Sequence, residues 1–175
     1  MSFNVSSLLG VDLNNASTTQ LFTLNQKVLG SDNSEWQYCI ATAALTTGQV
    51  VNIFPGGTAI AFTTAILNAS PTSATGPLDI GVAQFGISSS QYGFIAKRGS
   101  NLFVSVSGTC LPGGALGFSP TAGALCTGGL VAVGQTAAGI FVWTSGAANG
   151  GATAGLSLAV AVLTFPRPLV GVPQA

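Results

Sequence analysis

Residues 35–54 read EWQYCIATAALTTGQVVNIF, and this stretch decides the fold class. Its first part alternates large apolar residues (Trp36, Tyr38 and Ile40) with smaller or polar ones, which is the period-two pattern of a half-buried β-strand. Thr47-Gly48 is a turn signal, and a second strand is predicted over 49–54, where Pro55-Gly56-Gly57 ends it. The stretch therefore predicts two short strands joined by a tight connection.

Turn signals containing glycine and proline recur along the rest of the chain. Apolar residues do not recur at i, i+3 and i+4, and Gly and β-branched residues are too frequent for ordinary helices. Turn signals every 8–12 residues indicate about nine or ten short strands, hence an all-β fold, a small β-barrel or a β-sandwich. The spacing does not distinguish these two architectures. Further strands are predicted over 59–67, 80–87, 92–97, 101–107 and 115–118, in a hairpin of 130–133 with 140–144, and over 156–165, which Pro166-Arg167-Pro168 ends.

Residues 1–33 differ from the rest of the chain. They are rich in Asn, Ser, Thr and Leu, without a clean helical or strand period. We interpret them as an extended N-terminal arm, with one short helix or strand at most, followed by a single all-β body over 34–175. The regular supply of apolar residues favours docking of the arm on something else.

The composition excludes several classes of function. Only 5% of the residues are charged, with four basic and four acidic residues and no histidine. A nucleic-acid groove needs clustered Lys and Arg, so no nucleic acid is expected as a partner. Without histidine the commonest general base and metal ligand is missing, and no enzyme activity, metal or cofactor is expected. Low charge also suits a chain buried within an assembly, because interface centres are depleted in charge.

The cysteines Cys39, Cys110 and Cys126 are too widely spaced for a disulfide framework or a zinc site. We favour buried, reduced thiols, with one disulfide plus one free thiol as the alternative. The first residues carry neither a basic nor a sustained apolar region, so no signal peptide is expected. The apolar stretch 156–165 is too short for a membrane-spanning helix, so no membrane is expected as a partner.

Two charged clusters could carry chemistry or binding. Asp32 and Glu35 are the only acids close together in the sequence. We predict a turn there, since Asp and Asn hydrogen-bond to their own backbone in turns. Lys97-Arg98-Gly99 could meet an acidic partner, but we favour a role in capping a strand and keeping a sheet edge soluble.

Four segments follow one another along the body: SEWQYCIATAALTTGQVVNI (34–53), IGVAQFGISSSQYGFIAKRG (80–99), LFVSVSGT (102–109) and GALGFSPTAGAL (114–125), before the C-terminal apolar strand ending in proline. In this order they resemble the capsid decoration proteins of tailed bacteriophages, also called cement or head-stabilising proteins. The resemblance covers roughly residues 34–170. It implies a small all-β body on the capsid surface of the virion, made in the host cytoplasm. It also implies a homo-oligomer, with a trimer favoured, whose N-terminal arm reaches the major capsid protein, and no catalytic residues.

The function expected from this resemblance is mechanical. The protein would bind the outside of the phage capsid and stabilise the expanded shell by clamping neighbouring major capsid protein subunits. Deleting residues 2–25 would then leave a folded body that no longer binds shells. Another virion β-protein, such as a tail tube, fibre or spike component, is the main alternative; a surface adhesion domain and an enzyme are further ones. The candidate capsid-contact residues are Phe3, Val5, Leu8, Leu9 and Phe22, then Trp36 and Tyr38, for which burial in the body is favoured.

Overall fold

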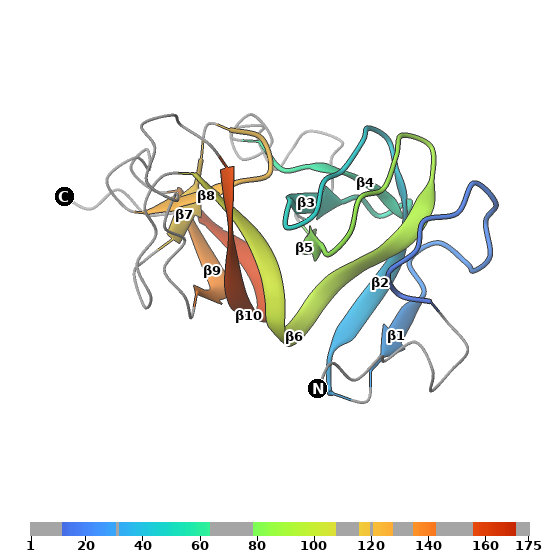
Figure 1. The fold of residues 1–175 in the computed structure, drawn as a ribbon, viewed down its shortest axis with the longest axis horizontal. Coiled ribbons are helices and arrows are strands. Elements are labelled where there is room, and N and C mark those ends of the chain that lie inside the picture. Colours follow the sequence, from blue (N-terminus) through green and yellow to red (C-terminus); the bar gives the residue numbers. More distant parts are fainter. Residues whose placement is uncertain are drawn as a thin grey trace.

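The computed structural model describes residues 12–30, 32–63, 79–107, 116–119, 121–127, 135–142 and 156–170. This part of the chain is all-β and contains no helix, as predicted, and its strands form one ten-stranded sheet (Figure 1). Accordingly, no helix long and apolar enough to cross a membrane is found among these residues. The strands are β1 (Lys27–Leu29), β2 (Glu35–Ala41), β3 (Val50–Ile53), β4 (Thr58–Ala61), β5 (Asp79–Ala83), β6 (Tyr92–Ser107), β7 (Leu116–Phe118), β8 (Leu125–Thr127), β9 (Gln135–Val142) and β10 (Leu156–Val170).

Five of these strands close into a barrel. The order is β2-β4-β3-β5-β6, and β6 pairs back onto β2 from Tyr92↔Ile40 to Arg98↔Glu35. The β3–β4 hairpin is antiparallel, whereas β4 lies parallel to β2. The extra strand β1 pairs with β2 outside the closed circuit. Of the two architectures left open by the strand spacing, this half of the molecule adopts the closed barrel, which removes free sheet edges.

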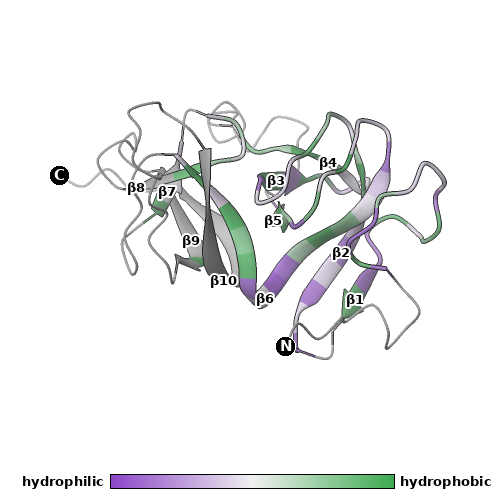
Figure 2. Ribbon diagram, viewed as in Figure 1, coloured by the Kyte–Doolittle hydropathy of each residue, from purple (hydrophilic) through white to green (hydrophobic). Residues whose placement is uncertain are grey.

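The long strand β6 continues into a second group of strands. After leaving the barrel it pairs with β10, which pairs with β9, and β7 and β8 lead back to β6 through Val106↔Leu125. Figure 1 shows β6 bent between the two groups. Gly99 (φ 153°) and Asn101 (φ 57°) provide the positive φ angles in this region. Figure 2 shows hydrophobic segments of β6 on both sides of a hydrophilic stretch at the bend.

A turn between β7 and β8 also joins the two groups. The Gly123 carbonyl oxygen accepts a 2.7 Å hydrogen bond from the Val50 N–H. The Gly123 N–H donates a 2.7 Å hydrogen bond to the Phe62 carbonyl oxygen. Gly123 has φ 73°, and a Cβ there would lie 2.0 Å from Cγ of Gln49. Only glycine fits this turn, because both the backbone and the available space exclude a side chain.

The interior of the barrel is filled by small and medium side chains from all five strands. They form one buried cluster: Cys39, Ala41, Leu45, Val51, Ile53, Ala59, Ala83, Ile87 and Ile95. At Gly81 a Cβ would lie 2.5 Å from Cγ2 of Ile95, so the interior has no room for a larger residue there. A five-stranded barrel is narrow, which explains why its interior positions carry little bulk.

The outer face of the barrel carries the large residues, among them Trp36, Tyr38, Ile80 and Phe94. The second group of strands covers part of this face, and residues 13–28 cover another part. As a result β2 is buried on both faces, with Gln37 and Cys39 as inaccessible as Tyr38. The predicted half-buried strand is therefore wrong: the alternation separates the barrel interior from a covered exterior.

Several predicted strand limits are corrected by the structure. The strands predicted over 92–97 and 101–107 are one strand of 16 residues, because Gly99 lets the chain bend without leaving the sheet. The last strand does not end at Pro166 but continues to Val170, with a register shift between Leu163 and Arg167 that leaves Pro166 out of the paired register. The strands predicted over 59–67 and 80–87 are shorter than expected, because β4 ends at Ala61 and β5 ends at Ala83. The strand predicted over 140–144 corresponds to β9, which pairs with β10 and β7. The hairpin partner 130–133 lies outside the described residues.

Candidate functional site

The seven predicted contact residues fall into two sets. Phe3, Val5, Leu8 and Leu9 lie outside the described residues. The other three, Phe22, Trp36 and Tyr38, pack within the chain itself. Trp36 and Tyr38 are only 6% and 2% exposed, which is the burial favoured for them from the sequence.

Phe22 and Tyr38 belong to an aromatic cluster between the N-terminal segment and the barrel. The Phe22 ring meets the Tyr38 ring edge-on at 5.2 Å and the Phe94 ring at 5.5 Å. Tyr38 stacks on Tyr92, with centroids 6.1 Å apart and planes 12° apart. Such pairs add to the stability gained by burial alone.

Backbone hydrogen bonds hold the segment against this cluster. Ser17 and Tyr92 exchange two N–H···O bonds of 2.9 and 2.8 Å, as in a short antiparallel bridge. The Leu21 N–H donates to the Tyr38 hydroxyl oxygen at 3.0 Å, and the Asn25 N–H donates to the Tyr38 carbonyl at 2.8 Å. Residues 12–30 of the predicted arm thus lie on the barrel as part of its covering layer.

A cavity of about 190 Å³ remains between this segment and the barrel, and we call it the aromatic pocket. Its walls come from Phe22 on the segment and from Tyr38, Tyr92 and Phe94 on β2 and β6, while Asp12 and Asn15 contribute polar groups. This pocket could not be predicted from the sequence, because nothing in the local pattern of residues 12–22 predicts their pairing with β6.

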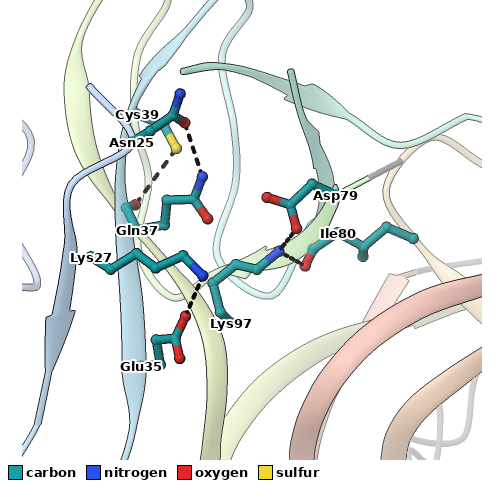
Figure 3. Close-up of polar contacts among 8 residues, drawn as sticks. All are labelled: Asn25, Lys27, Glu35, Gln37, Cys39, Asp79, Ile80 and Lys97. Atoms are coloured by element: carbon teal, nitrogen blue, oxygen red, sulfur yellow. Dashed lines mark hydrogen bonds and ion pairs between the residues drawn. The ribbon is translucent and has the colours of Figure 1, made fainter. Parts of the chain in front are cut away.

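A cluster of polar contacts lies at one end of the barrel (Figure 3). Lys97 is 3% exposed, and its ammonium donates to the Asp79 carboxylate and to the Ile80 carbonyl. Burial lowers the pKa of Lys97, while the bond to Asp79 raises it. The prediction that Lys97 keeps a sheet edge soluble is wrong, since the closed barrel places it inside.

The same end of the barrel carries two further contacts. Lys27 on β1 forms an ion pair of 2.8 Å with Glu35, and this bond raises the pKa of Lys27. The Gln37 amide donates to the Asn25 side-chain oxygen at 2.9 Å. Both contacts connect the N-terminal segment to β2 and fit a structural role.

The predicted acidic pair is a turn. Asp32 accepts a hydrogen bond from the Ser34 N–H at 3.1 Å, and Glu35 is engaged with Lys27. Cys39 is a buried, free thiol whose pKa is raised to about 12 by desolvation, so it is not a nucleophile near neutral pH. Within the described ranges no three His, Cys, Asp or Glu side chains gather as metal ligands would. Cys110 and the side chain of Cys126 lie outside what the structure describes.

The outermost strand β1 is a third feature of interest. In the described part of the chain it pairs only with β2, so its other edge has no strand partner there. Leu29 on β1 is 67% exposed and Leu21 in the preceding loop is 64% exposed. An edge strand beside apolar side chains can accept a strand from another protein.

No protein-family model matches the chain, and no curated protein is significantly similar to it.

Proposed function

We propose that the chain is a non-enzymatic structural protein of a bacteriophage virion. In this proposal it binds the outside of the capsid and stabilises the expanded shell by clamping neighbouring major capsid protein subunits. The observation that carries the proposal is the edge of β1 that has no strand partner among the described residues, with exposed Leu29 on that strand and exposed Leu21 in the segment before it, on a chain with very few charges. A charge-poor surface with an available strand edge favours lasting contact with another protein.

The stabilisation would arise by linkage. A protein that binds across subunits of the expanded shell, and not to dissociated subunits, shifts the equilibrium away from rupture. Each contact can be weak, because copies repeated by the shell symmetry, and linked as a trimer, act with high effective concentration. The chemistry of a catalytic site is not needed for this role.

The N-terminal arm supplies the second contact in this proposal, through Phe3, Val5, Leu8 and Leu9. These residues precede Asp12, which is exposed. Phe22, Trp36 and Tyr38 are left out of the proposed contact because they pack within the chain's own core.

The first test is the copy number of the chain in particles purified from its natural source. Quantitative mass spectrometry would compare it with the most abundant shell protein. A ratio near one, or a simple fraction of it, supports a lattice-wide decoration protein. A few copies per particle would point to a tail tube, fibre or spike component instead, and absence from particles would refute both.

The second test separates the arm from the body. A variant lacking residues 2–11 is expected to fold and to lose shell binding. The deletion stops there because removal up to residue 25 would also take away Leu13, Ser17 and Phe22, which cover the barrel. Undiminished binding of the truncated protein to shells would refute the role of the arm.

A further inference from the structure

We infer that the aromatic pocket is a binding site for an organic cation, namely a primary ammonium or guanidinium group on a short aliphatic chain. The inference does not depend on the virion proposal. It rests on three features found at one place: four aromatic side chains, a carboxylate without an ion-pair partner among the described residues, and a cavity of suitable size.

The walls of the pocket are aromatic. Phe22, Tyr38, Tyr92 and Phe94 all line it, and the stacked arrangement of Tyr38 and Tyr92 fixes two of the rings in place. Aromatic faces carry a negative quadrupole that attracts ammonium and guanidinium groups within about 6 Å of the ring centroid. The rings are also held by packing with one another, so the site is largely formed before a ligand arrives.

The polar groups at the pocket favour a positively charged donor. The Asp12 carboxylate accepts one hydrogen bond, from the Asn14 N–H at 3.0 Å, and it forms no ion pair with any described residue. None of the residues that line the pocket is basic. The hydroxyl oxygen of Ser17, also at the pocket, accepts from the Thr19 N–H at 3.0 Å and has a further lone pair. The lining therefore offers oxygen acceptors and aromatic side chains but no basic side chain.

The size of the cavity agrees with such a ligand. An apolar cavity of about 150 Å³ takes up benzene. The aromatic pocket, at about 190 Å³, has room for a head group with a short alkyl chain. The charged end would lie between Asp12 and the aromatic walls, and the alkyl chain would fill the remaining apolar part of the cavity.

Two sources could supply this group: a free small amine, or the side chain of a lysine or arginine on a partner protein. The full-length protein would be titrated with n-butylammonium and n-butylguanidinium, and with neutral n-butanol, while its aromatic resonances are followed by NMR. We expect both cations to bind with dissociation constants of about a millimolar and to bind more tightly than butanol. A blocked lysine tripeptide that binds at least as tightly as butylammonium assigns the site to a protein side chain, whereas exclusion of the tripeptide assigns it to a free amine.

A matched pair of variants isolates the carboxylate. Asp12 and Asp32 each accept a hydrogen bond from the N–H two residues later, at 3.0 and 3.1 Å, and both are exposed. Asp12→Asn keeps that acceptor and removes the charge, so we expect cation binding to weaken by roughly three- to tenfold. Asp32→Asn should leave it unchanged. Equal affinity for butanol and butylammonium, or equal weakening by both variants, would overturn the inference.

Discussion

The backbone N–H of Leu21 donates a 3.0 Å hydrogen bond to the hydroxyl oxygen of Tyr38, whose ring is buried on the outer face of β2. Through this bond a loop in the N-terminal third of the chain is tied to the aromatic face of the barrel. The Asn25 N–H bonds the Tyr38 carbonyl, so the same residue holds the segment by its side chain and its backbone. The covering segment is thus part of the folded domain.

Replacing Tyr38 by phenylalanine should loosen this segment without unfolding the barrel. The substitution keeps the ring contacts and leaves the Leu21 N–H without its partner, at a cost of about 1 kcal/mol. We expect faster amide hydrogen exchange at Leu21 and a small loss of free energy of unfolding. Tyr92→Phe is the control, because the structure gives the Tyr92 hydroxyl no hydrogen bond among the described residues. Equal exchange rates at Leu21 in the two variants would contradict this prediction.

Lys97 should make the stability of the protein depend on pH. Because burial lowers its pKa in the folded state, the unfolded chain binds more protons between that lowered pKa and 10.5. The free energy of unfolding contributed by Lys97 therefore rises with pH across this window. Cys39 acts in the opposite direction above pH 9.0, since its pKa in the folded state is raised to about 12.

Comparison of wild type with Lys97→Met at each pH separates the contribution of Lys97 from that of Cys39, because both proteins contain Cys39. The wild type should gain stability relative to the variant as the pH rises. Near neutral pH we expect the variant to be less stable than the wild type, because it leaves the Asp79 carboxylate and the Ile80 carbonyl without the Lys97 ammonium. Urea denaturation between pH 7 and 10 measures both quantities. Lys27→Met is the control. The bond to Glu35 raises the pKa of Lys27 in the folded state, so this variant should not reproduce the gain of stability with pH that Lys97 gives the wild type. Parallel pH profiles for wild type and Lys97→Met would show that Lys97 is not desolvated.

Gly123→Ala should destabilise the protein strongly. The new Cβ would have to displace Gln49, and the alanine backbone would have to adopt φ 73°. The turn that joins the two groups of strands would therefore be strained. We expect a loss of about 1–3 kcal/mol in the free energy of unfolding. Gly56→Ala is the matched control, because nothing lies within 4 Å of a Cβ there. Thermal denaturation of both variants tests the prediction, which fails if they melt at the same temperature.

Cys39 should react with iodoacetamide only when the barrel opens. Its thiol is buried and its pKa is raised by desolvation, so little thiolate exists near neutral pH. Peptide-level mass spectrometry after alkylation at pH 8 should find Cys39 unmodified in the native protein and modified in urea. Rapid modification of the native protein would show that the barrel interior is accessible to the reagent.

The all-β class and most of the described strand positions could be predicted from local sequence patterns. Alternation in 36–40 and the turn residues Thr47-Gly48 act over a few neighbours, and that local information is present in any window of the chain. The burial of Trp36 and Tyr38 and the turn at Asp32 also followed from local reasoning.

Tertiary structure alone decided which strands meet. Closure of the barrel needs β2 to pair with β6, far along the chain, and no local pattern encodes that register. The same closure buried Lys97 and made both faces of β2 inaccessible, although its alternation predicted one exposed face. The aromatic pocket exists because residues 12–22 lie across Tyr38, Tyr92 and Phe94, and only the assembled packing of distant segments creates such a cavity.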